Sequence, residues 1–293
     1  MERELWVRLY HLVMEVGKTV RLTEVTYQPH VIALVFLWAA LHDRPVAWAC
    51  QPRHWSTTTL RPPRLPHRTT VGRRIDHLAV GAFLREVERR LRDRQEVGLL
   101  ALLDGKPLLV SGVSKDHDAK PGRAAGGKGK GYKLHTLWAN RALPEAWEVT
   151  PLNEAESTVA RRLLRQAPGA GYVLADGNYD ASPVFDEAAA GGRQLVTPMP
   201  DPNAGQGHHY VSPYRRRCID LVRGDFGRSL YGQRRQIERL YGNAVSFGGG
   251  LGGLPAWVRG RERVRTWVWA KLLINATRIL QKQKQKQKQE LTS

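Results

Sequence analysis

The sequence predicts an α/β protein in which a mixed β-sheet with flanking helices follows a mainly helical N-terminal region. Two observations support this prediction. Apolar residues at helical spacing or in a continuous run indicate helices within residues 1–92. From about residue 95, short apolar runs follow one another and then alternate with helical segments, which is typical of a mixed sheet with helices on its faces. With 42% hydrophobic residues, the 293-residue chain can build one large or two ordinary packed domains.

Residues 1–92 are expected to form a helical DNA-binding region. Helices are predicted for LWVRLYHLVMEVG, VIALVFLWAAL and AVGAFLREVERRLRDR. The second of these is too short to cross a bilayer and is interpreted as a buried helix. Between the helices, residues 50–75 are rich in proline and arginine, as a linker would be. This combination favours a DNA-contacting module, although a charge run is more often a solvated face.

Residues 93–280 are expected to form the sheet domain. Strands are predicted for the apolar runs on either side of Asp104-Gly105-Lys106-Pro107, and for GYKLHTLWA, AWEVTPL, YVLA and QLVTPM. NEAESTVARRLLRQAPG predicts a helix with Asn153 as its N-cap and Glu156 three residues later. The chain is expected to be helical again from about residue 229. The repeat QKQKQKQKQE has low complexity, so residues 281–293 are expected to be a disordered tail.

The charge balance indicates a polyanionic partner. The chain has 46 Lys and Arg against 27 Asp and Glu, a net charge of +19 and a pI of about 10.4. Nucleic acid is the usual partner of such a protein, with a basic genome or an anionic membrane surface as alternatives. Cys50 and Cys218 lie far apart without a CxxC motif, which excludes a cysteine-pair zinc ribbon and a disulfide framework. The charged N-terminus lacks a signal-peptide pattern, so a cytoplasmic, nucleoid-associated protein is expected.

Two aspartates follow apolar runs that are predicted to be strands. Asp176 comes after YVLA and before Gly177-Asn178, and Asp104 comes after LLALL and before Gly105. Each has a simpler explanation, as a helix cap or turn residue for Asp176 and as part of a hairpin turn for Asp104. Because ligands collect at the carboxyl ends of strands in α/β sheets, both acids are expected to converge on one metal site.

A third acid is predicted on the helix YGQRRQIERLYGN. Tyr231, Arg234 and Glu238 fall within a stripe about 60° wide on such a helix. A surface helix with an Arg-Glu pair is the alternative. Together with two strand-end aspartates, Glu238 would complete a site for two Mg²⁺ or Mn²⁺ ions, which prefer hard oxygen ligands.

These motifs resemble those of a known family. LLDGKPL, LADGNYD and YGQRRQIERLYG are similar, in this order, to the three acidic motifs of bacterial insertion-sequence transposases of the DDE type. The third matches the family's Tyr-x2-Arg-x3-Glu signature. The resemblance covers roughly residues 95–280. It implies an RNase H-like catalytic fold, a catalytic and metal-binding triad, cleavage and strand transfer of double-stranded DNA, and a homodimer assembled on that DNA. The implied triad is Asp104, Asp176 and Glu238.

Basic and aromatic residues near the motifs are expected to contact DNA: Tyr231, Arg234, Arg235, Lys128, Lys130 and Lys133. One departure from the family pattern is Val245, where one group of relatives has a lysine seven positions after the glutamate. Arg259, Arg261 or Lys271 could supply that contact instead. The short spacing between Asp176 and Glu238 leaves no room for the large β insertion of some relatives.

Three other motifs could indicate nucleotide or metal binding, and two other functions are compatible with the sequence. GRAAGGK at 122–128 resembles a Walker A loop, but Gly129 replaces the Ser or Thr and a strand is predicted to follow. Asp116-His117-Asp118 and His208-His209 could bind metal, but a solvated loop and a structural role are the simpler explanations. A catalytically inactive or domesticated DNA-binding relative and a nuclease of the same fold are the alternatives to a transposase.

Overall fold

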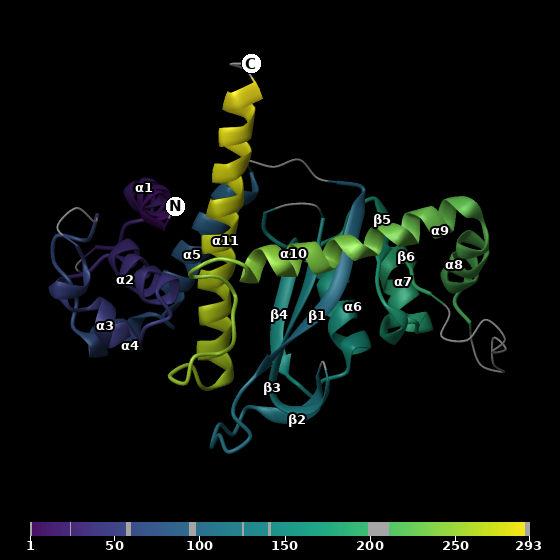
Figure 1. Cartoon of the computed structure of the whole chain (residues 1–293), viewed down its shortest axis with the longest axis horizontal. Helices are drawn as coiled ribbons and strands as arrows, with labels where there is room; N and C mark the ends of the chain where they lie inside the picture. Colours follow the sequence, from purple (N-terminus) through teal and green to yellow (C-terminus); the bar gives the residue numbers. More distant parts are fainter. Residues whose placement is uncertain are drawn as a thin grey trace. The chain divides into compact units, whose positions relative to one another are not determined.

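The computed structural model describes residues 2–23, 25–56, 60–93, 98–124, 126–139, 142–198 and 211–290. It divides the chain into two compact units (Figure 1). Unit 1 combines Met1–Gln95 with Ala244–Ser293, and unit 2 is Glu96–Asn243. Residues 244–280, which were expected in the sheet domain, therefore group with the N-terminal helices. Within the described residues, no helix is both long and apolar enough to cross a membrane.

Unit 1 is built from helices around an apolar core. Its α-helices are α1 (Glu2–Thr19), α2 (Pro29–Leu41), α3 (Val46–Ala49), α4 (Arg68–Arg74), α5 (Leu78–Arg92) and α11 (Arg261–Glu290). α2 is buried on nearly all sides, as its continuous apolar sequence requires. The rings of Trp6, Trp38 and Trp55 pack at centroid distances between 4.7 and 5.7 Å. α11 joins this core because most of its residues between Val264 and Ala276 are apolar and buried.

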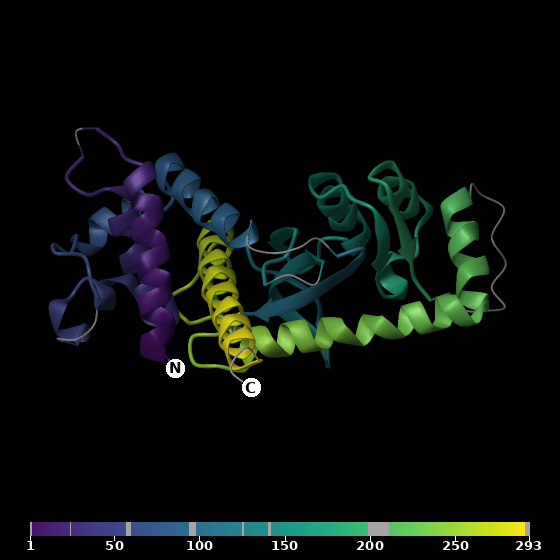
Figure 2. The same cartoon turned by 90° about the horizontal axis from the view of Figure 1, so that it is seen from above.

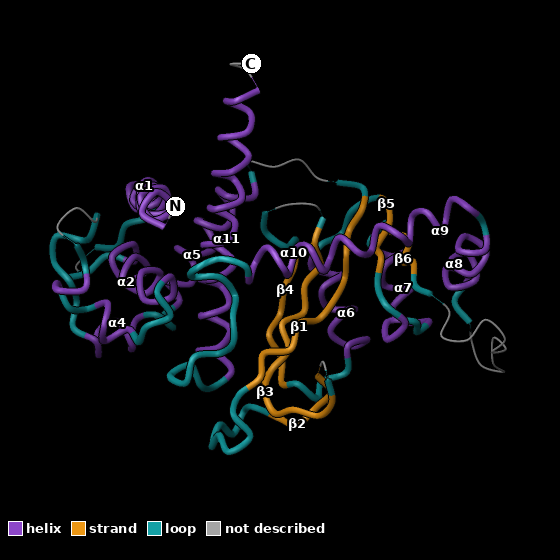
Figure 3. The backbone as a smooth tube through the Cα atoms, in the orientation of Figure 1, coloured by secondary structure: helices purple, strands orange, loops and turns teal. Residues whose placement is uncertain are grey.

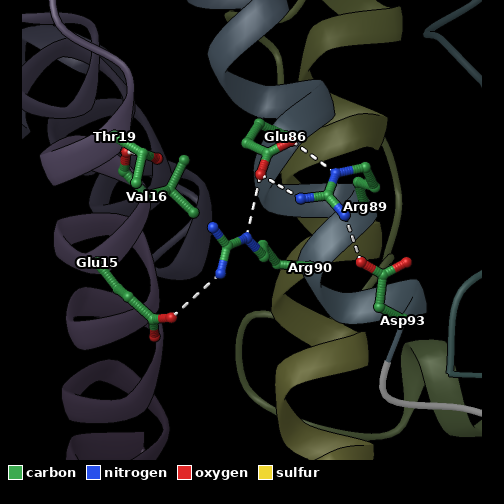
Figure 4. Close-up of polar contacts among 7 residues, drawn as sticks. All are labelled: Glu15, Val16, Thr19, Glu86, Arg89, Arg90 and Asp93. Atoms are coloured by element: carbon green, nitrogen blue, oxygen red, sulfur yellow. Dashed lines mark hydrogen bonds and ion pairs between the residues drawn. The ribbon is translucent and has the colours of Figure 1, made fainter.

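An ionic network joins α5 to α1 (Figure 4). Glu86 accepts hydrogen bonds from Arg89 and Arg90, Arg90 also reaches Glu15 of α1 at 3.5 Å, and Arg89 pairs with Asp93. These contacts are largely exposed and contribute little stability individually. They partly neutralise the arginines at the end of α5, a helix of the region expected to bind DNA.

The C-terminal repeat is helical, which corrects the expectation of a disordered tail. α11 continues through residues 281–290 and ends at Glu290. Lys and Gln are both good helix formers, and extending a helix that is already anchored in a core avoids the cost of nucleation. Gln281 is buried and donates to Glu4 of α1 at 3.2 Å, so the packed part of the helix reaches this residue. Residues 291–293 lie outside the described residues.

Unit 2 contains a mixed sheet of strands β1 (Leu100–Leu109), β2 (Lys120–Ala124), β3 (Gly127–Trp138), β4 (Ala146–Pro151), β5 (Gly171–Leu174) and β6 (Arg193–Val196), shown in Figure 3. The strand order is β2-β3-β1-β5-β6, and β4 pairs with β3 on the same edge as β2. β1, β5 and β6 are parallel, whereas β3 is antiparallel to β1, β2 and β4. This is the RNase H-like arrangement that the motifs imply.

Helices cover both faces of this sheet (Figure 2). α6 (Glu156–Gln166) and α7 (Ser182–Ala190) lie on one face. On the other face runs a helical segment made of α9 (Asp225–Gly232), a 3₁₀ turn η3 (Gln233–Arg235) and α10 (Gln236–Val245). α8 (Pro213–Arg223) precedes this segment and packs against β6. The signature residues are thus carried across the face of the sheet opposite α6.

Two local predictions were wrong. β1 does not stop at Asp104 but runs unbroken through Gly105-Lys106-Pro107 to Leu109, because β3 pairs with it as far as Leu109 and Gly131. Pro107 is tolerated because the pairing with β5 has already ended at Leu102, so a backbone N–H is not needed on that side. Asn153 is not the cap of α6, which begins at Glu156 after Ala155.

Candidate active site

Asp104 lies on β1, and Asp176 follows the end of the neighbouring parallel strand β5. Leu102 of β1 is paired with Leu174 of β5, the last residue of that strand. Each aspartate follows its leucine by two residues, so the strand register continued by one pleat places the two aspartates side by side. The carboxyl end of β5 thus brings together two acids that are far apart in the sequence.

Arg234 lies between the two carboxylates. Its Nη2 is 3.8 Å from Asp104 Oδ2 and 3.6 Å from Asp176 Oδ2. The three side chains are between 22% and 31% exposed, so solvent reaches the cluster but does not fully screen it. One guanidinium thus offsets part of the repulsion between two adjacent anions.

The remaining carboxylate oxygens are held by the backbone. Asp104 Oδ1 accepts from the N–H of Gly105 at 2.8 Å, and Asp176 Oδ1 accepts from the N–H of Asn178 at 2.9 Å. Asp176 is also the N-cap of the 3₁₀ turn Gly177–Tyr179. The capping role that is one explanation of Asp176 is therefore present in the structure, together with its position beyond the end of β5.

Burial raises the pKa of Asp104 to about 6. The Gly105 N–H and the Arg234 charge oppose this shift in the pKa, whereas the charges of Asp176 and Glu156 add to it. Glu156, in the first turn of α6, is held by Lys133 of β3 at 2.5 Å. Glu156 is predicted from the sequence only as a residue of the helix cap, so the structure adds a carboxylate to the electrostatics of the site.

Tyr241 fixes α10 against the sheet beside Asp104. Its hydroxyl lies 2.7 Å from Thr136 Oγ1 and donates to the carbonyl of Asp104 at 3.2 Å. The ammonium of Lys106 lies 5.9 Å from its ring centroid. Burial raises the pKa of the Tyr241 hydroxyl well above its usual value. Sequence analysis missed this residue, although it falls three positions after Glu238 on the predicted stripe.

Glu238 is placed less closely than the two aspartates. It lies on α10 between Arg234 and Tyr241 in the sequence and is exposed. Among the described residues, no three His, Cys, Asp or Glu side chains are grouped closely enough to hold a metal ion. Of the expected triad, the structure therefore brings together Asp104 and Asp176, and leaves Glu238 on the adjoining helix.

The expected DNA contacts differ in how available they are. Tyr231 is half-buried at the end of α9, where burial raises its pKa, and Arg235 is exposed on the 3₁₀ turn. Lys128 is exposed and Lys130 donates to the carbonyl of Ser114. Lys133 is buried and forms an ion pair with Glu156, so its charge is neutralised within the protein.

The three residues that could supply the contact of the missing lysine differ in burial and in hydrogen bonding. Lys271 is fully buried, pairs with Asp43 at 2.7 Å and donates to two carbonyls, so it holds unit 1 together and is not accessible to DNA. Arg259 donates to the carbonyls of Pro255 and Val258. Arg261 is the first residue of α11. Both Arg259 and Arg261 remain candidates for the DNA contact.

The other motifs are accounted for by the fold. GRAAGGK spans the end of β2 and the start of β3, so it is a hairpin and not a strand-to-helix phosphate loop. Asp116 accepts from the Tyr132 hydroxyl at 2.8 Å and from the N–H of Asp118 at 3.1 Å, as a residue that orders its loop would do. His208 and His209 lie outside the described residues.

An RNase H-like sheet that places two aspartates beside Arg234 is compatible with a nucleic-acid-processing enzyme. The family model of the transposase DDE domain matches residues 97–274, more than half of the chain. The protein therefore belongs to the DDE transposase family, of the insertion-sequence type. No curated protein matches the chain.

The residues at the site are suited to the divalent metal ions that this family generally uses. Asp104 and Asp176 offer adjacent carboxylate oxygens, which are the ligands that Mg²⁺ and Mn²⁺ prefer. The Arg234 guanidinium sits close to both, which indicates that this position favours positive charge. The donor set therefore fits a divalent cation, although two aspartates alone do not make a complete site.

Proposed function

We propose that this protein is a transposase that cleaves DNA at the ends of a mobile element and joins those ends to target DNA. The observation that carries the proposal is the placement of Asp104 beside Asp176 at the carboxyl end of β5. Family membership implies a DNA substrate and an enzyme that cleaves or transfers nucleic acid. The proposed reaction is hydrolysis of one phosphodiester, which releases a 3′-hydroxyl, followed by attack of that hydroxyl on a target phosphodiester.

The proposed roles follow from where the side chains lie. Asp104 and Asp176 would hold Mg²⁺ or Mn²⁺, with Glu238 as a third ligand when α10 presents it. Two bound ions would activate the attacking oxygen and stabilise the leaving oxygen. Arg234, once released from the aspartates, would bind the phosphate of the cleaved strand, and Tyr231 would orient that strand.

End recognition is assigned to the N-terminal segment. Residues 44–75 contain seven arginines and no acidic residue. Several of these arginines are exposed on loops and on α4, among them Arg53, Arg61, Arg64, Arg68 and Arg73. A surface of this kind suits the phosphate backbone of double-stranded DNA. A homodimer assembled on DNA would present two such surfaces to the two ends of an element.

One assay separates this proposal from its alternatives. Purified protein is incubated with Mn²⁺, a duplex carrying the element's terminal repeat and a supercoiled target plasmid, and both nicked and joined products are measured. A transposase gives both products. A nuclease of the same fold cuts without joining, and an inactive DNA-binding relative shifts the duplex in a gel without cutting it.

A further inference from the structure

A cavity of about 380 Å³ opens in unit 2 away from the aspartates. It lies where β5 and β6 begin, against α8, and its lining includes Tyr172, Arg193, Gln194, Tyr214, Arg217 and Leu221. Tyr172 and Asp176 are four residues apart along the same strand and its exit, a separation of about 13 Å. The cavity is therefore a separate site, within a few nucleotides' reach of the candidate active site.

Two tyrosines, Tyr172 and Tyr214, line the cavity, and Phe226 lies beside Tyr172 outside the lining. The rings of Tyr172 and Phe226 meet edge to face at 6.1 Å, and Phe226 is 60% exposed. Gln194 Nε2 donates to the carbonyls of Leu195 and Tyr214, which fixes the amide group. Its Oε1 is buried and has no hydrogen-bond partner among the described residues.

The charge around the cavity is positive. Residues 211–243, which include α8, α9 and most of α10, contain eight arginines and three acidic residues. Arg216 and Arg217 are both exposed on α8, and none of the residues that line the cavity is acidic. Helix α9 contains both Phe226 and Tyr231. Burial, together with the charges of Asp176 and Asp104, raises the pKa of the Tyr231 hydroxyl.

We infer that this cavity binds an unpaired nucleobase of the DNA strand that the enzyme processes, an assignment that rests on the proposed function. The rings of Tyr172 and Tyr214 stack on the base, and Arg217 contacts the adjoining phosphate. Cavities of this size are typical of small-molecule sites and accommodate one base.

The test compares two DNA probes on the full-length protein. One is a blunt duplex, and the other is the same duplex with a three-nucleotide single-stranded overhang that contains 2-aminopurine, a fluorescent base that is quenched when it stacks. The parent protein should bind the overhang duplex about 5- to 100-fold more tightly, because stacking one base on an aromatic side chain has an effect of this order. Quenching should accompany binding.

Three variants identify the cavity as the source of this preference. Ala189→Leu fills the cavity from α7 without removing a polar or aromatic group. Tyr214→Ala removes one ring from a residue that is already 38% exposed. Both should abolish the preference and the quenching and leave blunt-duplex binding unchanged. Phe185→Leu, in the buried part of α7, controls for general loosening of the unit and should keep the preference.

Several other results would refute the inference. It is overturned if the parent does not prefer the overhang, or if Ala189→Leu keeps the preference. It is also overturned if only Arg217→Gln loses the preference, because the occupant is then a phosphate. Failure of the proposed function looks different: a protein that neither cuts nor joins DNA but still discriminates the overhang through this cavity refutes the transposase activity alone.

Discussion

Asp104 and Asp176 hold their carboxylates in the same way. In each, Oδ1 accepts from a backbone N–H one or two residues further along the chain, and Oδ2 faces the guanidinium of Arg234. The backbone contacts fix the orientation of both groups before any ligand arrives. Arg234 is the one partner of the pair that can leave without unfolding a strand or a turn, so it competes with any cation that the aspartates bind.

Removing the Arg234 charge should strengthen metal binding in the absence of DNA. Arg234→Gln should bind Mn²⁺ roughly 2- to 30-fold more tightly than the parent, since each of two partly exposed ion pairs contributes about 0.2–1 kcal/mol. Isothermal titration calorimetry measures this directly. Arg235→Gln is the matched control, being exposed on the same 3₁₀ turn, and should leave the affinity unchanged. Weaker Mn²⁺ binding by Arg234→Gln would show that the guanidinium supports the metal site.

His135 should make the protein sensitive to mild acid. It is 1% exposed and lies 3.1 Å from Thr150 Oγ1, and burial lowers its pKa from 6.5 to about 3. Below about pH 6.5, His135 is therefore protonated in the unfolded chain but stays neutral in the folded protein. The stability associated with neutral His135 is fully present above that pH and is lost progressively as the pH falls toward 3.

The corresponding measurement is urea unfolding at pH 7 and pH 5. Over this interval the parent should lose about 2 kcal/mol through His135. His135→Asn should be less stable than the parent at pH 7, because it leaves a cavity, but it should lose less stability between the two pH values. His117→Asn, at an exposed position, should show the parent's pH dependence. Equal slopes for His135→Asn and the parent would contradict the prediction.

The end of α11 should act only as an electrostatic tether. The exposed lysines beyond Gln281, among them Lys282, Lys284 and Lys286, lie past the last packed residue. Deleting residues 283–293 should leave the melting temperature nearly unchanged and reduce the dependence of non-specific DNA binding on salt by a few counterions. Deleting from residue 280 onward should also destabilise unit 1, because it removes the contact of Gln281 with Glu4. Loss of folding in the shorter deletion would contradict this division.

The N-terminal arginines should govern binding to the element's ends. Changing Arg61 and Arg68 together to Gln should weaken binding to a terminal-repeat duplex by more than it weakens binding to a random duplex. Lys128→Gln, on the exposed β2–β3 hairpin, should weaken both to the same extent. Competition gels at two salt concentrations separate the two effects. An equal loss for both duplexes in the arginine variant would move end recognition elsewhere.

The sequence predicted the fold class, the helical N-terminal region and the two sheet aspartates, because hydrophobic periodicity reports local structure directly. It could not predict the continuity of β1, since Asp104-Gly105-Lys106-Pro107 has the composition of a turn and only pairing with β3 keeps it extended. Long-range pairing also decided that α11 joins the N-terminal helices, a contact that no local pattern encodes.

The remaining site residues show the same limit. Glu156 and Tyr241 approach Asp104 only once the sheet and α10 have formed, so their sequence contexts indicate a capping acid and an amphipathic helix. Conversely, Arg234 was expected to contact DNA, and its position between two carboxylates depends on the register between β1 and β5. Tertiary contacts thus decide which of several plausible polar residues belong to the site.

The third carboxylate is the decisive question about the active site, because two residues could supply it. Glu238 matches the family signature but is exposed on α10, whereas Glu156 influences the pKa of Asp104 but is bound to Lys133. We expect Glu238 to be the ligand, since an unburied carboxylate on a helix can turn toward the aspartates, and freeing Glu156 would leave the buried Lys133 without its partner.

Amide variants distinguish the two. Asp104→Asn, Asp176→Asn and Glu238→Gln should each bind end-containing DNA normally and lower Mn²⁺-dependent nicking by several orders of magnitude, because each removes one anionic ligand and keeps the side-chain shape. Glu156→Gln should instead lower the melting temperature and leave the nicking rate of the folded protein within about tenfold of the parent, as a positioning residue would. Asp225→Asn, with a side chain that is 99% exposed, should nick at the parental rate. If Glu238→Gln nicks normally and Glu156→Gln does not, the third ligand lies on α6 and Lys133 must release it during the reaction.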